Sequence, residues 1–143
     1  MQFLLALIWL YPLFTPTPPV TAEVEYVFHN IRNEKGLIRL GAYNTAGSFT
    51  DHPAYTFAFD KKTMQGGQLV GRFSLPEGTY AFSILDDENR DEEMNFNLIG
   101  IPKEGYGFSK DAPIKFLTPP SFEDCAVQVS PGKQRLRMKV RYF

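Results

Sequence analysis

The chain has 143 residues, of which 43% are hydrophobic and 22% are charged, a balance typical of a globular protein with one core rather than of a disordered chain. The formal net charge is −1 and the pI is about 6.1. Because no excess of positive charge is available to attract phosphate groups, the composition argues against a nucleic-acid partner.

The first 22 residues differ in composition from the rest. An apolar run from Phe3 to Phe14 precedes a proline-rich stretch, and the first charged residue is Glu23. The run is too short to cross a hydrocarbon layer of about 30 Å as a helix. Val20-Thr21-Ala22 ends in the small residue that signal peptidase requires, although a basic residue near the start is lacking. We predict a signal peptide over residues 1–22, a mature domain over 23–143 without a transmembrane span, and a secreted or periplasmic location.

From Val24 onward, apolar and polar residues alternate with the period of two that is typical of half-buried β-strands. Short runs of this kind recur between turn signals, and no amphipathic pattern of helix length occurs. The runs cover residues 24–28, 38–42, 55–59, 69–75, 80–84 and 135–142. The pattern predicts an all-β fold, a single sandwich of about seven strands.

The first two runs, 24–28 and 38–42, are joined by a turn that ends at Gly36, and we expect them to form a hairpin-like pair. Tyr80 follows a Pro-Glu-Gly-Thr turn. It is either the tyrosine of a tyrosine corner, with its hydroxyl bonded to the backbone across the turn, or an ordinary strand aromatic. Cys125 is the single cysteine, so no disulfide forms within the chain, and core packing is its expected role.

The last run alternates almost perfectly. Its apolar side chains are expected to face the core and its cations to face solvent, where Lys and Arg also discourage edge-to-edge pairing of strands; the alternative is an anion-binding stripe. If the first strand lies beside it, Glu23 and Glu25 would pair with these cations. The core-facing residues are Leu136, Met138, Val140 and Tyr142, and the cations are Arg135, Arg137, Lys139 and Arg141.

Residues 86–124 show little clear periodicity, yet loops longer than about 12–15 residues are uncommon unless they are functional or disordered. Disorder fits poorly, because eight large apolar side chains could pack this segment onto the sandwich. They are Phe96, Leu98, Ile99, Ile101, Tyr106, Phe108, Phe116 and Phe122. We predict a long ordered loop that caps the sandwich.

Several stretches resemble the bacterial exported family catalogued as domain of unknown function 2141. They are "DEN", "LIGIPKEGYGFS" (Leu98 to Ser109), "PPSFEDCAVQV" (Pro119 to Val129), "IRNEKGLIRLGAYN" (Ile31 to Asn44), "FSLPEGTYAFSILDDEN" and the closing "LRMKVRY". The resemblance covers nearly all of the mature chain. It implies export and a β-sandwich of immunoglobulin-like or transthyretin-like type, and it implies no established activity.

The resemblance also implies that the stretch "DDENRDEEMN", residues 86–95, corresponds to a His-Asp-Glu-Asn-Gly-Asn-Gly run with a later Asp, much like a calcium loop. This chain has Asp86 in place of the histidine and Asn95 in place of the later Asp. Arg90 and Glu92 stand where glycines are usual.

Ca²⁺ prefers six to eight oxygen ligands, which alternate positions of a tight loop can supply. We predict a weak calcium site, with Glu123 and Asp124 nearby if the cap folds back. The predicted ligands are Asp87, Asn89, Asp91 and Asn95. The alternative is a solvated acidic turn whose side chains bond local backbone N–H groups. The absent glycine, which the EF-hand loop needs for its sharp turn, favours this alternative.

Two carboxylates can also catalyse glycoside hydrolysis, but one of them needs a raised pKa, and this polar run does not promise the required burial. His29 and His52 belong to no recognisable nucleophile motif. A phosphate-binding loop, a dinucleotide fingerprint and a Cys/His zinc spacing are also missing from the sequence. We therefore predict a non-enzymatic protein.

The function that fits best is a binding or accessory module of the cell envelope, expected to be a monomer, with a glycan or an envelope protein as partner. The alternatives are a weak calcium-binding structural domain and a carboxylate-dependent hydrolase. The candidate ligand surface combines cap aromatics with neighbouring acids, Tyr106, Phe108, Phe122, Glu123 and Asp124. If these aromatics are buried, they hold the cap on the sandwich instead.

Overall fold

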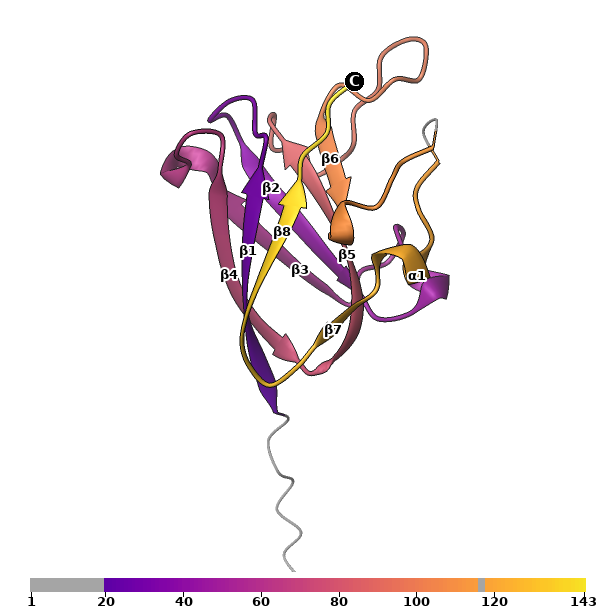
Figure 1. Ribbon diagram of the computed structural model, residues 1–143. Coiled ribbons are helices and arrows are strands. Elements are labelled where there is room, and N and C mark those ends of the chain that lie inside the picture. The colour runs from indigo at the N-terminus through magenta and orange to yellow at the C-terminus, as the bar shows by residue number, and fades with distance from the viewer. Residues whose placement is uncertain (1–19, 116–117) are drawn as a thin grey trace, which may run out of the picture.

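The computed structural model describes residues 20–115 and 118–143, so the predicted signal peptide lies almost entirely outside the described residues. Two sheets pack face to face, which confirms the predicted all-β sandwich (Figure 1). One sheet has the strand order β4-β1-β8 and the other β3-β2-β5-β6, with β7 also paired to β5. The strands are β1 (Thr21–His29), β2 (Leu37–Tyr43), β3 (Tyr55–Asp60), β4 (Leu69–Pro76), β5 (Gly78–Asp87), β6 (Gly105–Phe108), β7 (Val127–Val129) and β8 (Gly132–Lys139).

Short helices connect some of the strands, and β6 lies within the segment predicted as a loop cap. The helices are η1 (Ala46–Ser48), η2 (Lys61–Thr63), η3 (Ser109–Asp111) and α1 (Phe122–Cys125). Within the described part of the chain, none is long and apolar enough to cross a membrane.

The predicted hairpin between the first two runs is wrong, because β1 and β2 belong to different sheets. The chain between them is anchored by Ile31, whose side chain is buried and whose N–H donates to the carbonyl of Gly67. The segment held by Ile31 therefore crosses from the sheet that contains β1 to the sheet that contains β2. Strand β1 instead pairs antiparallel with β4 and parallel with β8.

The pairing of β1 with β8 places opposite charges side by side, as the sequence predicts. The Glu25 carboxylate lies 3.1 Å from Arg135 and 2.9 Å from Arg72, a residue of β4. Glu23 lies 3.8 Å from Lys133, a residue of β8 that precedes the predicted run of cations. Exposed pairs of this kind stabilise a fold only slightly, so they give the outer face of this sheet its polarity rather than its stability.

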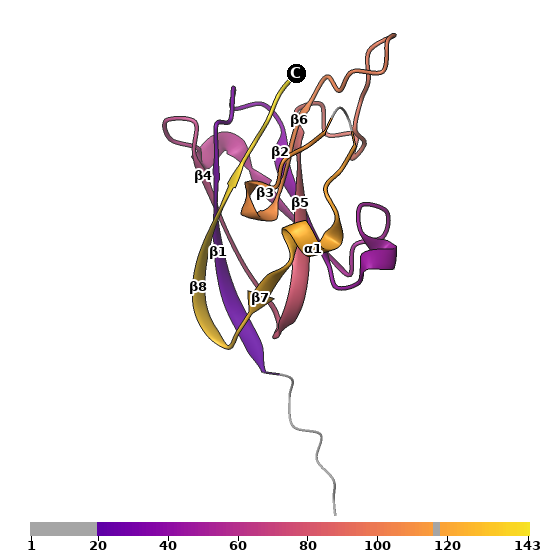
Figure 2. The same cartoon turned by 45° about the vertical axis from the view of Figure 1, so that its right-hand side comes forward.

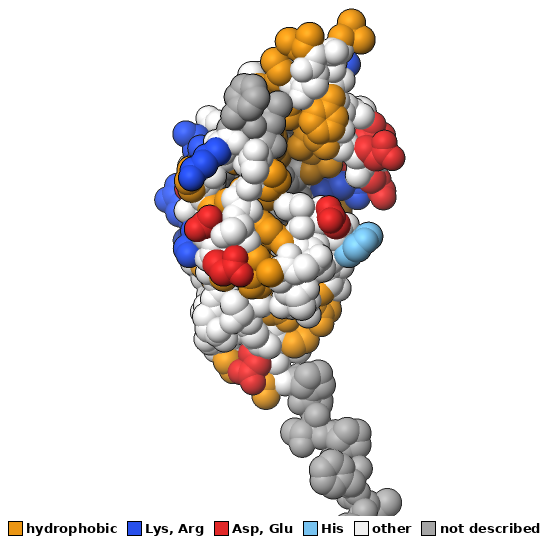
Figure 3. Space-filling model, turned by 90° about the vertical axis from the view of Figure 1, so that its right-hand side faces the viewer, with side chains coloured by type: hydrophobic (Ala, Val, Ile, Leu, Met, Phe, Trp, Pro, Cys, Tyr) orange, Lys and Arg blue, Asp and Glu red, His pale blue; other side chains and the backbone are white. Residues whose placement is uncertain are grey.

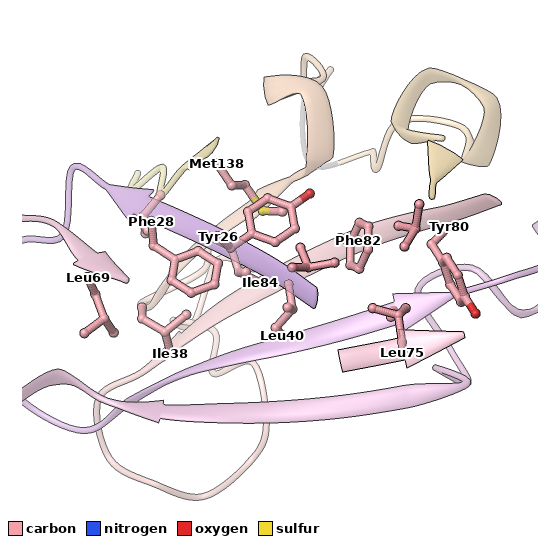
Figure 4. Packing of buried hydrophobic residues seen from close by; sticks show 14 of the residues in the cluster. Tyr26, Phe28, Ile38, Leu40, Leu69, Leu75, Tyr80, Phe82, Ile84 and Met138 are labelled. Carbon is pink, nitrogen blue, oxygen red and sulfur yellow. The ribbon is translucent and has the colours of Figure 1, made fainter. Parts of the chain in front are cut away.

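Aromatic side chains fill the space between the sheets (Figure 4). The ring of Tyr26 lies 5.6 Å from that of Phe28 and 5.2 Å from that of Phe82, measured between centroids. Met138 and Val140 of the last run are fully buried in the same cluster, as predicted. Each large side chain buried in this way contributes about 1.5–3 kcal/mol to folding.

Tyr80 forms the tyrosine corner, since its hydroxyl donates to the carbonyl of Pro76 at 3.1 Å. Cys125 is fully buried in a second apolar cluster beneath the cap, which confirms its predicted role in packing. Burial raises the pKa of its thiol to about 11, so the reactive thiolate is strongly disfavoured.

A buried polar network closes the upper end of the sandwich. The side chains of Lys61 and Asp86 are both completely buried, with Nζ 2.5 Å from Oδ1. The hydroxyl of Tyr142 donates to the other carboxylate oxygen at 2.6 Å, and Lys61 also donates to Asn33. Burial raises the pKa of Asp86, while the hydrogen bonds from Lys61 and Tyr142 oppose this shift. The network connects η2, the end of β5 and the C-terminal residues.

We predict that Lys61→Met lowers the free energy of unfolding by about 3–5 kcal/mol, because it leaves the Asp86 carboxylate buried without its counter-charge. Lys62→Met is the matched control, since Lys62 is exposed and its substitution should change stability by less than about 0.5 kcal/mol. Urea unfolding of both variants measures the difference. Equal effects of the two substitutions would show that the ion pair does not support the fold.

Candidate cation site and adjoining groove

The acidic loop, residues 87–95, begins at the last residue of β5 and is held together by its own side chains. The carboxylate of Asp87 accepts hydrogen bonds from the N–H groups of Asp91 at 3.1 Å and Glu92 at 3.2 Å. The side-chain oxygen of Asn89 also accepts from the N–H of Asp91, at 3.1 Å, and Asp91 accepts from that of Glu93 at 3.0 Å. These local bonds are the ones expected of Asp and Asn in tight turns. They turn the side-chain oxygens toward the middle of the loop.

The tight turn forms although its glycines are missing. Arg90 and Glu92, the two positions at which the sequence resemblance implied glycine, adopt φ angles of 65° and 70°. A side chain in this left-handed region costs about 1–2 kcal/mol, so the surrounding hydrogen bonds must stabilise the conformation. Gly36 supports the start of the loop, because its φ is 77° and the backbone of Asp87 leaves no space for a side chain there.

Glu104, which precedes β6, completes the cluster and was not predicted from the sequence as a site residue. Only 5% of its surface is exposed. Its carboxylate accepts from the N–H of Glu88 at 3.2 Å and from that of Asn95 at 3.3 Å. Carboxylate oxygens of Asp87, Asp91 and Glu104 all lie within 4.8 Å of one another. Two carboxylates of the acidic loop and one from the residue before β6 therefore lie close together.

The charges in this cluster are only partly balanced. Arg39 of β2 donates from Nε to Asp87 at 2.5 Å and places Nη2 3.0 Å from Glu92. Burial, together with the charges of Asp87 and Asp91, raises the pKa of the Glu104 carboxyl, although its two backbone hydrogen bonds oppose the shift. The hydrogen bond from Asn95 and other local donors lower the pKa of Asp91. One guanidinium beside three carboxylates leaves an excess of negative charge that a cation would neutralise.

The structure brings all four predicted calcium ligands together. Asn89 donates from Nδ2 to Asp91 at 2.9 Å and to Asn95 at 2.7 Å, and Asn95 donates to Asp91 at 2.9 Å. Carboxylate and amide oxygens are the donors that Ca²⁺ prefers, so the residue types suit the ion, while both amides here direct Nδ2 toward Asp91 and would have to turn to offer oxygen. Asp87 is held next to Asp91 because its carboxylate accepts a hydrogen bond from the backbone N–H of Asp91.

Glu123 and Asp124 do not join this cluster. Both lie on α1, where the Asp124 carboxylate accepts from the N–H of Ser121 and the Ser121 hydroxyl accepts from the N–H of Asp124. This reciprocal capping begins the short helix, which packs against β5. The Asp124 side chain thus helps to start α1, while the Glu123 side chain is exposed.

The predicted aromatic ligand surface is mostly buried. Tyr106 and Phe108 of β6 are 8% and 7% exposed. The ring of Phe49 lies 5.9 Å from that of Phe108 and 6.0 Å from that of Phe122, measured between centroids, with edge-to-face geometry in both pairs. These aromatics hold the cap on the sheet, which is the alternative that the sequence left open.

A groove of about 660 Å³ lies on the outer face of the five-stranded sheet. Its floor is made of small and apolar residues from β2, β3 and β5, namely Gly41, Ala58, Ser83 and Leu85. Residues of the surrounding loops form its sides. They are Pro53, Ile114 and Pro119, together with Met94, Phe96 and Pro102. Figure 3 shows hydrophobic side chains between the loops on this side of the molecule, with acidic side chains beside the upper ones.

The cation cluster and the groove share a segment of chain. Glu92 and Met94 of the acidic loop line the groove, and Arg39 lines it while bonded to Asp87. A change in the position of the acidic loop would therefore change the shape of the groove on the side that Glu92 and Met94 form.

A family model described as an uncharacterized protein conserved in bacteria matches residues 27–137. No curated protein and no solved structure matches the chain.

We predict that Arg90→Gly and Glu92→Gly each leave the free energy of unfolding unchanged or raise it by up to about 1 kcal/mol, because glycine adopts a positive φ without strain. Glu93→Gly, in the same loop but without a positive φ, is the matched control and should lower stability by about 0.5–1 kcal/mol. Urea unfolding compares the three. Equal losses in all of them would contradict the left-handed turn.

Proposed function

The chain belongs to the DUF2141 family of uncharacterized proteins conserved in bacteria, and we propose that it is an exported, non-enzymatic binding or accessory module of the cell envelope that holds Ca²⁺ in its acidic loop. One observation carries the proposal. Carboxylates of Asp87, Asp91 and Glu104 converge within 4.8 Å on a loop that also lines a groove. A cation bound there would hold the acidic loop in place and so stabilise one side of the groove.

Calcium suits the donor set better than magnesium. Ca²⁺ accepts irregular sets of six to eight oxygens, whereas Mg²⁺ demands near-ideal octahedral geometry and keeps several waters. Asp87 and Glu104 are nearly or fully buried, so their mutual repulsion is weakly screened and a divalent ion would relieve it. Arg39 competes for Asp87, and the positive φ angles at Arg90 and Glu92 add strain. The expected affinity is therefore in the millimolar range of extracellular modules.

Binding is favoured over carboxylate catalysis, although the pKa values of Glu104 and Asp91 shift in opposite directions, as in an acid and base pair. A general acid must reach its substrate at hydrogen-bond distance. Glu104 is 5% exposed and its oxygens accept two backbone N–H bonds, which directs them toward the loop.

The groove supports a ligand role for the same end of the molecule. Pockets that bind small molecules or extended chains are mostly apolar with a few polar groups. Here the charged groups at one end, Arg39 and Glu92, are already paired with each other at 3.0 Å. An uncharged glycan or a peptide of an envelope protein would fit this surface.

Calcium should raise the thermal unfolding midpoint of the protein, because an ion that binds only the folded state stabilises it by about 0.4 kcal/mol at a concentration equal to its Kd and by about 1.4 kcal/mol at ten times its Kd. Thermal melting is measured in millimolar Ca²⁺ and in chelator. Glu104→Gln should abolish the shift, and Glu123→Gln, an exposed acid on α1, should retain it. An unchanged midpoint of the parent protein with and without calcium would refute the cation site.

The groove is tested by Ala58→Trp, which fills its floor with a large side chain from the outer face of β3. A glycan array and a pull-down from an envelope extract are run with this variant and with Val70→Trp on the exposed face of β4 as control. We expect a ligand signal that Ala58→Trp removes and Val70→Trp keeps. A signal that survives in both variants would place the ligand elsewhere.

A further inference from the structure

The hairpin of residues 95–103 projects beyond the ends of the strands, past the C-terminal residues, in both ribbon views (Figures 1 and 2). Its tip carries the two most exposed large hydrophobic side chains among the described residues, Leu98 at 106% and Ile99 at 79% relative exposure. Phe96, lower on the hairpin, is 54% exposed. The two side chains are adjacent, so they form one exposed apolar tip rather than scattered single residues, and contiguous apolar surface is what marks interaction sites.

The tip is a defined turn with its own hydrogen bonds. Asn97 and Ile101 are bonded across the hairpin, and the N–H of Gly100 donates to the carbonyl of Asn97 at 3.0 Å. The side-chain oxygen of Asn97 accepts from the N–H groups of Ile99 at 3.0 Å and Ile101 at 2.9 Å. Most backbone donors of the tip are therefore satisfied without water, a requirement for any chain that enters an apolar layer.

A cation stands at the base of the hairpin. Lys103 is exposed, and its N–H bonds to the carbonyl of Asn95 on the opposite strand at 2.8 Å. Lys103 is four positions after Ile99 in the sequence, which places the two roughly 13 Å apart at most. An ammonium at this depth lies near anionic lipid headgroups when the tip reaches the acyl chains, as in interfacial anchors.

The shape of this surface favours a bilayer over a protein partner. A stable protein interface buries about 800 Å² on each side, far more than two side chains at a convex tip can offer. A fluid acyl layer instead surrounds both side chains completely, and each aliphatic side chain moved out of water strengthens binding by about tenfold.

We propose that the 95–103 hairpin inserts Leu98 and Ile99 into the surface of a phospholipid bilayer, with Lys103 at the headgroups. The contact is weak and reversible, because it uses two side chains and one cation. It does not depend on calcium binding by the acidic loop, so it is tested separately.

The test places an environment-sensitive fluorophore at the tip through Leu98→Cys, with Val70→Cys on the exposed face of β4 as control. The native Cys125 is fully buried and stays unlabelled. Vesicles of phosphatidylethanolamine and phosphatidylglycerol are added to the full chain, so that both variants share the same N-terminal segment. We expect a blue-shifted, brighter emission at position 98 and none at position 70. No change at 98, or equal changes at both positions, overturns the proposal.

A second measurement is vesicle co-sedimentation of the double variant Leu98→Ser with Ile99→Ser. The bound fraction should fall by at least about tenfold relative to Val70→Ser, because the tip has lost its apolar side chains. An equal bound fraction in both variants would contradict insertion. Self-association of the parent protein that the double variant abolishes, without vesicle binding by either, would also overturn it in favour of a contact between copies.

Discussion

The buried ion pair between Lys61 and Asp86 fixes the end of β5, and the rest of the upper end of the molecule is arranged around it. Neighbouring residues of a strand point to opposite faces, so Asp86 faces the core while Asp87 faces the outer side of the sheet. Tyr142 bonds to Asp86 and accepts from the backbone N–H of Arg32, which joins the C-terminus to the same point. Two adjacent carboxylates thus serve different roles, one as an anchor inside and one as the first residue of the acidic loop.

Hydrogen bonds to two buried carboxylates then fix the conformation of the acidic loop. Asp87 and Glu104 are held in place by backbone N–H groups and, for Asp87, by Arg39. These bonds hold the loop in a conformation that Arg90 and Glu92 adopt only with a strained backbone. Because the same loop lines the groove, a cation at the cluster would act on a surface that could bind a ligand. The chemistry of the site and its position on the fold therefore support one functional account.

The sequence predicts those features that depend on local period and composition. Alternation reveals most of the strands, and the predicted pairing of Glu25 with a cation of the last strand is formed by Arg135. For Tyr80 the turn motif left two alternatives open, and the hydrogen bond to Pro76 decides for the tyrosine corner. Contacts between distant segments are harder to predict. The false β1–β2 hairpin reflects this difficulty, since Ile31 is anchored by Gly67 far along the chain. Glu104 was missed because only tertiary packing of the cap brings it beside Asp87, and the packing of Phe108 against Phe49 is likewise a contact between distant segments.

The most direct test of the cation site is a crystal structure of the protein grown in calcium, with anomalous scattering used to locate the ion. The account predicts one ion between Asp87, Asp91 and Glu104, with carboxylate oxygens at about 2.3–2.6 Å from it. Crystals grown in millimolar calcium that show these carboxylates bonded to backbone N–H groups, with no ion among them, would contradict it.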